Sequence, residues 1–446
     1  MHITKSDLKS MLKLAVPVVM AELGWVSMSI VDTMMVGRLS AEAIGAVSVG
    51  SSLFLAVAIF GIGLLLGLDT LVSQAFGAGR FDECGRWLVH GIYLSLMLTP
   101  LLSLIMIIPI VVLDGWGTEP RVLELTIPYL TTLTWSIFPL LLYATFRRYL
   151  QARSRVQCVM FALISANIVN AIANWLLVFG NLGFPEMGVE GAGWATFISR
   201  VYMAGTLLGF ILVRRGHLDS IFNQLSFSLE PKRIATLLGL GFPAAMQITL
   251  EVGVFALATA LASRLDSVSL AAHQIALSAA SFTFMVPLGV SAAGAVSVGQ
   301  ALGRKRPDQA SAAGWTALII GVIFMSFATS AFLVTPRPII RIFTTQPGVM
   351  ATGVSLLAVA AFFQIFDSLQ VISTGLLRGI GDTKTPMITS LFCHWFLGLP
   401  VGYYLCFVLD WGVQGLWVGL CIGLVLVALW LLTVWWQKIR ALTSSR

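Results

Sequence analysis

Charge is scarce in this chain of 446 residues: Asp, Glu, Lys and Arg together make up 11% of it, whereas 58% of the residues are hydrophobic. Soluble globular domains are about a quarter charged. Soluble α/β enzymes are therefore excluded, and the composition indicates an all-α protein that crosses a membrane many times. The formal net charge of +7 is spread over several loops, which argues against a nucleic-acid-binding patch.

Cysteine and catalytic motifs are also scarce. The five cysteines are odd in number and lie in or beside apolar segments, which is typical of packed free thiols rather than of a disulfide framework. The sequence has no Cys/His cluster with metal-ligand spacing, and no Walker A, nucleophile-elbow or HExxH pattern. We therefore expect a protein that is not an enzyme and needs no cofactor, so that any driving force comes from an ion gradient.

Long apolar runs, in contrast, are abundant, and twelve of them can be marked. Each is long enough to cross a bilayer as a helix, for which about 20 residues suffice. The predicted spans lie near residues 13–37, 46–70, 87–113, 123–146, 156–180, 190–213, 234–262, 270–297, 312–334, 350–376, 386–409 and 413–436. The longest connection, residues 214–233, is the one stretch that resembles a linker.

Lysine and arginine are distributed unequally between the two sides of these spans. With the N-terminus inside, 21 of the 27 basic residues lie at inner span ends and five lie in outer loops. Because positively charged loops stay on the cytoplasmic side, this asymmetry predicts that both termini are cytoplasmic. The expected location is the cell membrane, or the inner membrane if the source is Gram-negative, with the chain passing through it many times.

The chain also contains an internal repeat. A shift of 226 residues places Pro17 on Pro243 and Gln74 on Gln300, and matches continue at nearly the same offset to residue 195. Each copy holds six spans, an even number, so both copies enter the membrane in the same sense, as in transporters built from parallel repeats. The prediction is two six-helix bundles. They form an amino-terminal lobe at 1–213 and a carboxy-terminal lobe at 234–446, joined by a cytoplasmic linker at 214–233.

Five acids fall within the predicted spans, accompanied by one base, Arg200. Charged side chains at membrane depth are costly and by default indicate function. The excess of acid favours a cationic passenger, or protons, over an anion. The repeat does not duplicate these acids, since Asp32 aligns with Ala258 and Glu251 with Trp25. We therefore expect the charged residues of the two bundles to have different roles. The five acids are Glu22, Asp32, Asp69, Glu251 and Asp367.

Glu251 and Asp367 each have apolar turns on both sides, and we expect them to carry an ion or a proton. Polar neighbours are available, since Gln247 lies one turn before Glu251, and Gln364 and Gln370 lie three residues on either side of Asp367. The alternative for either acid is a permanently protonated carboxyl group that is bonded to a neighbouring helix.

Asp32 lies towards the outer end of the first span. Asn170 and Asn174 stand four residues apart, so both amides lie on one helix face, and Ala192 and Thr196 have the same spacing in the next span. Carboxylate, amide, backbone and hydroxyl oxygens suit a hard monovalent cation, which makes a Na⁺ site one interpretation. The other is a helix-end carboxylate that reaches interfacial water, with the amides making hydrogen bonds between helices.

The other polar residues within spans are weaker candidates. For Glu22 two interpretations remain, a residue that lines a cleft or a polar contact between helices. Asp69 is expected to anchor a loop. The isolated histidines lie on mostly apolar faces, where a histidine is more often packed than catalytic; they are His90, His273 and His394.

Five motifs of the chain resemble those of the multidrug and toxic compound extrusion transporters, in their NorM-like branch. They are VDTMMVGRLS at the end of the first span, DTLVSQAFGAG after the second, PAAMQITLEVG in the seventh, AAHQIALS entering the eighth and FFQIFDSLQVISTGLLRGIGDTKTP around the tenth. Together they cover essentially the whole chain. The resemblance implies twelve helices in two lobes with a central V-shaped cleft, and the exchange of Na⁺ or H⁺ for organic cations.

The same resemblance implies roles for individual residues. Those that match the family's amino-lobe cation site, which would hold Na⁺, are Asp32, Asn170, Asn174 and Thr196, with a backbone oxygen from Ala192. Those that match the family's carboxy-lobe ion and substrate acids are Glu251 and Asp367.

We therefore expect a secondary active antiporter that exports cationic amphipathic organic compounds, in exchange for Na⁺ or H⁺, by alternating access. Its expected partners are small-molecule organic cations and membrane lipid, with no nucleic acid, and we expect a monomer. The residues leave the choice between Na⁺ and H⁺ open.

Two other functions fit these residues less well. A flippase of lipid-linked saccharides, from the same superfamily, would need a cationic cleft for a pyrophosphate, which Arg200 alone does not supply. A channel would need symmetric pore-lining charges, and the acids of the two halves are unequal.

Overall fold

The computed structural model describes residues 4–112, 120–213 and 228–444, and within these ranges the chain is helical without strands. The first half forms α1 (Lys5–Val36), α2 (Ala41–Leu64), α3 (Gly67–Gly77), α4 (Phe81–Val112), α5 (Pro120–Trp135), α6 (Ile137–Ala152), α7 (Val156–Leu177), the 3₁₀-helix η2 (Asn181–Gly183) and α8 (Gly188–Val213). The second half forms α10 (Pro231–Ala262), α11 (Ser267–Gly303), α12 (Pro307–Val334), α13 (Pro336–Arg341), α14 (Pro347–Ile380), α15 (Lys384–Ser390), the π-helix η3 (Leu391–Gly398), α16 (Leu399–Phe407) and α17 (Gly412–Ser444).

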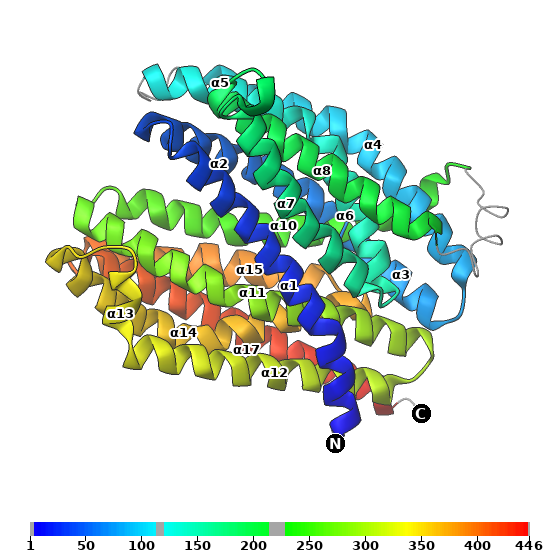
Figure 1. The fold of residues 1–446 in the computed structure, drawn as a ribbon. Helices are drawn as coiled ribbons and strands as arrows, with labels where there is room; N and C mark the ends of the chain where they lie inside the picture. The colour runs from blue at the N-terminus through cyan, green and yellow to red at the C-terminus, as the bar shows by residue number, and fades with distance from the viewer. Residues whose placement is uncertain (1–3, 113–119, 214–227, 445–446) are drawn as a thin grey trace. The chain divides into compact units, whose positions relative to one another are not determined.

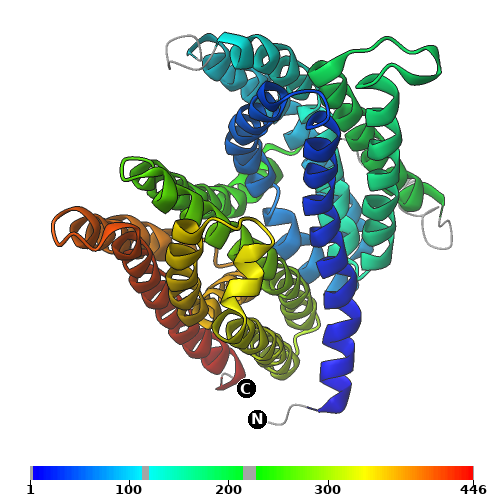
Figure 2. The same ribbon diagram turned by 60° about the vertical axis from the view of Figure 1, so that its left-hand side comes forward.

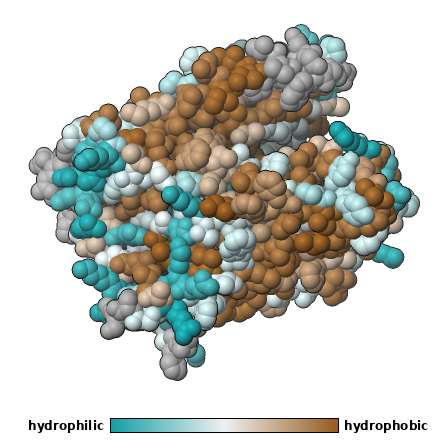
Figure 3. Space-filling model, turned by 180° about the vertical axis from the view of Figure 1, so that it is seen from behind, coloured by the Kyte–Doolittle hydropathy of each residue, from teal (hydrophilic) through white to brown (hydrophobic). Residues whose placement is uncertain are grey.

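The described helices are those of a multi-pass membrane protein. Eleven are long and apolar enough to cross a bilayer, and there is a twelfth span if the bent pair of α5 and α6 counts as one. Hydrophobic residues cover much of the face drawn in Figure 3, and hydrophilic residues gather at its left and right margins and in a column through its lower part. The predicted all-α, many-span architecture is confirmed.

The predicted span at 123–146 is broken. Helices α5 and α6 meet at an angle of 46°, with Ser136 between them. Pro139 favours a break at this position because proline offers no N–H to the preceding turn and its ring crowds the carbonyl four residues earlier. The Ser136 hydroxyl donates to the Leu133 carbonyl at 2.5 Å, so the side chain takes part in the bend.

The described chain separates into two compact units. The amino unit is Met20–Ala245, and the carboxy unit is Met1–Val19 together with Met246–Arg446. The divisions fall inside α1 and α10, after Val19 and Ala245, which the 226-residue repeat makes equivalent positions.

The first part of each of these two helices packs into the core of the other half of the chain. Met11 and Ala15 of α1 are buried in one hydrophobic cluster with Val290 of α11, and Leu237 of α10 is buried in the cluster that fills the amino unit. The units therefore differ from the predicted lobes, 1–213 and 234–446, by exchanging these segments. Most of the predicted linker, at 214–227, lies outside the described residues.

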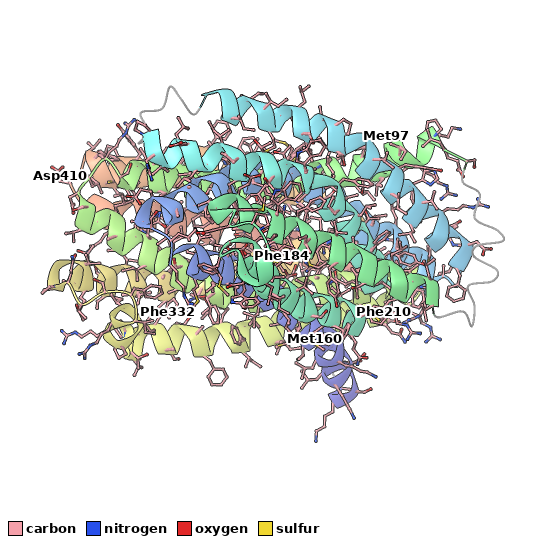
Figure 4. The ribbon with its side chains drawn as sticks, turned by 45° about the horizontal axis from the view of Figure 1, so that its top comes forward. Met97, Met160, Phe184, Phe210, Phe332 and Asp410 are labelled. Carbon is pink, nitrogen blue, oxygen red and sulfur yellow. The ribbon has the colours of Figure 1, made fainter. Side chains whose placement is uncertain are left out.

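Close helix packing fixes the side chains within each unit. In the amino unit α7 and α8 lie side by side (Figure 1), and Phe161 meets Phe210, labelled in Figure 4, edge to face with ring centroids 5.9 Å apart. In the carboxy unit α11, α12, α14 and α17 pack together (Figure 2). There the buried indole of Trp435 lies against Gly314, where a Cβ atom would collide with it.

A tight turn joins α14 to α15. Gly381 adopts a φ of +101°, which glycine tolerates best, and Asp382 accepts hydrogen bonds from the Thr385 N–H at 3.0 Å and from Lys438 of α17 at 2.5 Å. Burial raises the pKa of Asp382, but the hydrogen bonds from Lys438 and Thr385 outweigh burial and hold this pKa below its ordinary value. The carboxylate thus caps α15 and ties it to the end of α17.

We expect Asp382→Ala to destabilise the fold by about 1 kcal/mol, because the cap is lost. Asp382→Asn should cost less, since asparagine caps as well as aspartate and only the ion pair is lost. A depressed pKa stabilises the fold above the unfolded pKa of about 3.9, and this contribution disappears as the pH falls through the folded value. Thermal unfolding in detergent should therefore separate wild type from Asp382→Asn near neutral pH but not in strong acid. A difference that does not depend on pH would contradict this account.

Candidate ion-binding sites

Glu251 of α10 lies in a polar site of the carboxy unit. Its two carboxylate oxygens accept one hydrogen bond each, from Gln247 one turn earlier at 2.6 Å and from Gln370 of α14 at 2.8 Å. Both amide side chains are buried. The carboxylate is thus held by two neutral donors, and no salt bridge to Glu251 or Asp367 is present within the described ranges.

Asp367 lies one turn before Gln370 on α14, and its carboxylate interacts electrostatically with that of Glu251. The structure therefore brings the two predicted carboxy-lobe acids together, with Gln370 beside them. Gln364, the other predicted polar neighbour, is engaged elsewhere, since its amide oxygen accepts from the Thr283 hydroxyl of α11 at 3.0 Å. Two acids and two amides make up this carboxy-unit acid pair site.

Trp395 fixes the backbone next to Glu251. Its indole N–H donates to the carbonyl of Leu250 at 3.0 Å, and its ring lies against Gly253, where a Cβ atom would come within 3.2 Å of it. The indole projects from the π-helical segment η3, and such segments are often found at functional sites. In the sequence Trp395 was one of several aromatic residues in spans, and no local pattern distinguishes it from the others.

Asp32 of α1 is the centre of a polar cluster in the amino unit. Its Oδ1 accepts from the amides of Asn170 at 3.0 Å and Asn174 at 2.7 Å, and its Oδ2 accepts from the Thr196 hydroxyl at 3.1 Å. The Thr196 oxygen also lies 3.0 Å from the carbonyl of Ala192. The four side chains and Ala192 are buried. The structure thus brings together all five residues predicted here; that they bind an ion stays a prediction.

The two amides of this cluster turn their N–H groups to Asp32, because an ionised carboxylate can only accept hydrogen bonds. The Asn170 oxygen accepts from Asn174 at 3.2 Å, whereas the buried Asn174 oxygen has no hydrogen-bond partner in the described part of the chain. In this arrangement both amides donate to the carboxylate, and the Asn174 oxygen is left without a partner.

Arg200 of α8 is buried one turn after Thr196 and interacts electrostatically with Asp32. Its guanidinium donates to the hydroxyl of Ser136, at the bend between α5 and α6, and lies 4.4 Å from the ring centroid of Phe54. A guanidinium stacked on an aromatic face and bonded at one end is held in one place.

Two more arginines accompany the other acids of the amino unit, contrary to the expectation that Arg200 is the one base among them. Arg147 of α6 is buried and forms a salt bridge with Glu22, and Arg148 lies 3.4 Å from Asp69. Glu22 is therefore a polar contact between helices. The sequence could have indicated that Arg147 is buried. It lies about one turn from Tyr143 and from Leu150 on α6, so the three side chains share the buried face of this helix.

His273 is a packed histidine. The indole N–H of Trp417 donates to its Nδ1 at 3.0 Å, so the proton sits on Nε2, which lies 2.9 Å from the Thr259 hydroxyl. That hydroxyl in turn donates to the Phe255 carbonyl at 3.0 Å. Both ring nitrogens are therefore used to hold α10, α11 and α17 together.

The MatE family model matches the chain twice, at residues 17–176 and 243–404. The chain belongs to the MatE family of transporters. The two matched segments begin at Pro17 and Pro243, the residues that the 226-residue shift superimposes, so the family model and the internal repeat agree. The predicted recognition of a multidrug and toxic compound extrusion transporter is confirmed.

Relatives of this MatE chain match it over nearly its full length. It is 35% identical to the probable multidrug resistance protein NorM of Mesorhizobium japonicum, covering 98% of this chain and 96% of that protein. It is 33% identical to the multidrug resistance protein NorM of Photobacterium profundum, covering 97% and 95%. The crystal structure of the eukaryotic MATE transporter AtDTX14 has the same two-lobe fold, with a TM-score of 0.88 at 22% identity over 99% of both chains.

The salt bridge between Glu22 and Arg147 provides a stability test. Removing one partner of a buried ion pair costs about 3–5 kcal/mol, because the other charge is left uncompensated. We expect Glu22→Gln and Arg147→Met each to lower the midpoint of thermal unfolding strongly, and the double variant to recover much of the loss. As a control, Glu83→Gln breaks the exposed pair with Arg80 and should have little effect. Additive losses in the double variant would show that the two charges do not act as a pair.

Proposed function

We propose that this MatE-family chain is a secondary antiporter that exports cationic amphipathic organic compounds in exchange for Na⁺ or H⁺ by alternating access. The observation that carries the proposal is the carboxy-unit acid pair site. The half-buried acids Glu251 and Asp367 interact there, with two amide donors on Glu251, and no base forms a salt bridge to either acid among the described residues.

The chemistry of this site favours the uptake of positive charge. Two neighbouring carboxylates among apolar helices repel each other when both are ionised, and a proton, Na⁺ or an organic cation relieves that repulsion. Species that satisfy the same acids compete, so binding of one promotes release of another. Transport follows if the competing species prefer different conformations, since a ligand shifts an equilibrium only through its differential affinity for the two states.

The relatives support the same proposal, because two of them are named multidrug resistance proteins and cover nearly the whole chain. We further propose that the protein works as a monomer in the cell membrane with both termini in the cytoplasm, as the distribution of Lys and Arg indicates. Its proposed partners are small organic cations and membrane lipid.

No observation favours the flippase that the sequence left as an alternative. A site for a pyrophosphate needs arginines that are free to bind it. In the amino unit Arg147 forms a salt bridge with Glu22, Arg148 lies beside Asp69, and Arg200 bonds Ser136, stacks on Phe54 and interacts electrostatically with Asp32.

The acid pair can be tested in proteoliposomes that carry either a pH gradient alone or a Na⁺ gradient alone. We expect wild type to expel a cationic dye under one of these gradients, and Glu251→Gln and Asp367→Asn each to reduce that efflux to the level of empty liposomes. The physical reason is that a neutral amide cannot exchange one cation for another. Dye fluorescence reports the rate of efflux.

Glu186→Gln and Asp410→Asn are matched controls, because they make the same chemical changes at exposed positions and should leave efflux unchanged. Asp410 lies in the turn after α16 with a φ of +56°, which asparagine also tolerates, and it is labelled in Figure 4. Efflux that survives in both acid-pair variants would overturn the proposed mechanism.

A further inference from the structure

The acids within the spans of the two units, buried in the amino unit and half-buried in the carboxy unit, are compensated in different ways. In the amino unit each acid has an arginine near it: Arg147 for Glu22, Arg148 for Asp69 and Arg200 for Asp32. In the carboxy unit Glu251 is held by two amides, and its charged neighbour is a second acid, Asp367. With every group ionised, the three acids of the amino unit are balanced in charge, whereas the acid pair of the carboxy unit is not.

Arg200 is held beside the Asp32 cluster by contacts that do not involve the carboxylate. It lies four residues after Thr196, whose hydroxyl bonds Asp32, so both side chains are on the same face of α8. The hydroxyl of Ser136 and the ring of Phe54 fix the guanidinium from the other side. Its charge therefore belongs to the scaffold and cannot leave the site as a bound ion can.

The repeat shows that this arrangement belongs to the amino unit alone. The final segments of the two halves align at an offset of 224, which places Thr196 on Leu420 and Arg200 on Leu424. Both counterparts are apolar and buried in the carboxy unit. The carboxy unit therefore has no equivalent of the tethered charge at this position.

We propose that Arg200 is the tethered counter-cation of Asp32, which keeps free Na⁺ out of the Asp32 cluster and leaves the coupling ion to Glu251 and Asp367. The part that concerns Glu251 and Asp367 rests on the proposed function, whereas the exclusion of Na⁺ from the Asp32 cluster does not. The Na⁺ site predicted from Asp32, Asn170, Asn174 and Thr196 thus does not fit the residues that surround it.

Electrostatics and hydrogen bonding both disfavour Na⁺ in the Asp32 cluster. Asp32 and Arg200 together carry no net charge, so an added cation would give the buried cluster a net positive charge beside a guanidinium, in surroundings that screen it poorly. Asp32 already accepts three hydrogen bonds, and both amides turn N–H groups rather than oxygens toward its carboxylate. Without Arg200, the same carboxylate, hydroxyl and backbone oxygens would form an acidic site that can be filled.

The proposal is tested by binding of radioactive ²²Na⁺ to the purified full-length chain in detergent, with K⁺ keeping the ionic strength constant. Wild type and Asp32→Asn should bind the same amount of Na⁺. Arg200→Met should bind an additional Na⁺ per chain, and Arg200→Met combined with Asp32→Asn should lose it again. Arg200→Lys keeps the charge and should bind no more Na⁺ than wild type.

Two results would overturn the proposal: loss of bound Na⁺ from wild type on Asp32→Asn, or an Arg200→Met variant that elutes as a folded monodisperse protein and binds no additional Na⁺. If Arg200→Met does not fold, Arg200→Gln replaces it, because the amide keeps a donor for Ser136 without the charge. Binding is measured without any gradient, so a failure of the proposed antiport leaves this test intact. If wild type binds no Na⁺ at all, the proposal is tested by whether Arg200→Met binds Na⁺.

Discussion

The constraint on which the structure depends is the cost of burying a carboxylate among apolar helices. An ionised acid without partners costs more than a fold can offset, so each one needs a base, hydrogen-bond donors or a bound cation. The amino unit supplies arginines: Arg147 of α6 forms a salt bridge with Glu22, and Arg200 of α8 interacts electrostatically with Asp32. The carboxy unit supplies only the amides of Gln247 and Gln370 to Glu251. In the amino unit the arginines therefore balance the charge of the acids, whereas the acids of the carboxy unit can accept a cation or a proton.

Because of the internal repeat, the two halves of the chain share one helical scaffold, and the boundaries between the units fall at equivalent positions in both halves. Both divisions between the units fall three residues after an aligned proline, at Met20 after Pro17 and at Met246 after Pro243, and the family model matches once from each proline. The charged residues, in contrast, differ between the two copies of this scaffold. A duplicated bundle can keep its packing while its polar residues diverge, because the core depends mainly on the apolar residues.

Much of this could be predicted from the sequence, because the signals are strong and local. Hydropathy gave the spans, and the four-residue spacing of Asn170 and Asn174 placed both amides on one face, where they meet Asp32. What could not be predicted depends on three-dimensional packing. Helical spacing shows which way Arg147 points, but its partner Glu22 lies 125 residues away, and the indole of Trp395 bonds a carbonyl 145 residues away.

The central claim is that Glu251 and Asp367 hold either the coupling ion or an organic cation, but not both. The most direct measurement is the release of H⁺ and of Na⁺ when a quaternary phosphonium cation binds to the purified protein, followed in weakly buffered solution. The account predicts that binding releases one of these ions from wild type and that the release disappears in Glu251→Gln and Asp367→Asn. Binding of the phosphonium to wild type without release of either ion would contradict it.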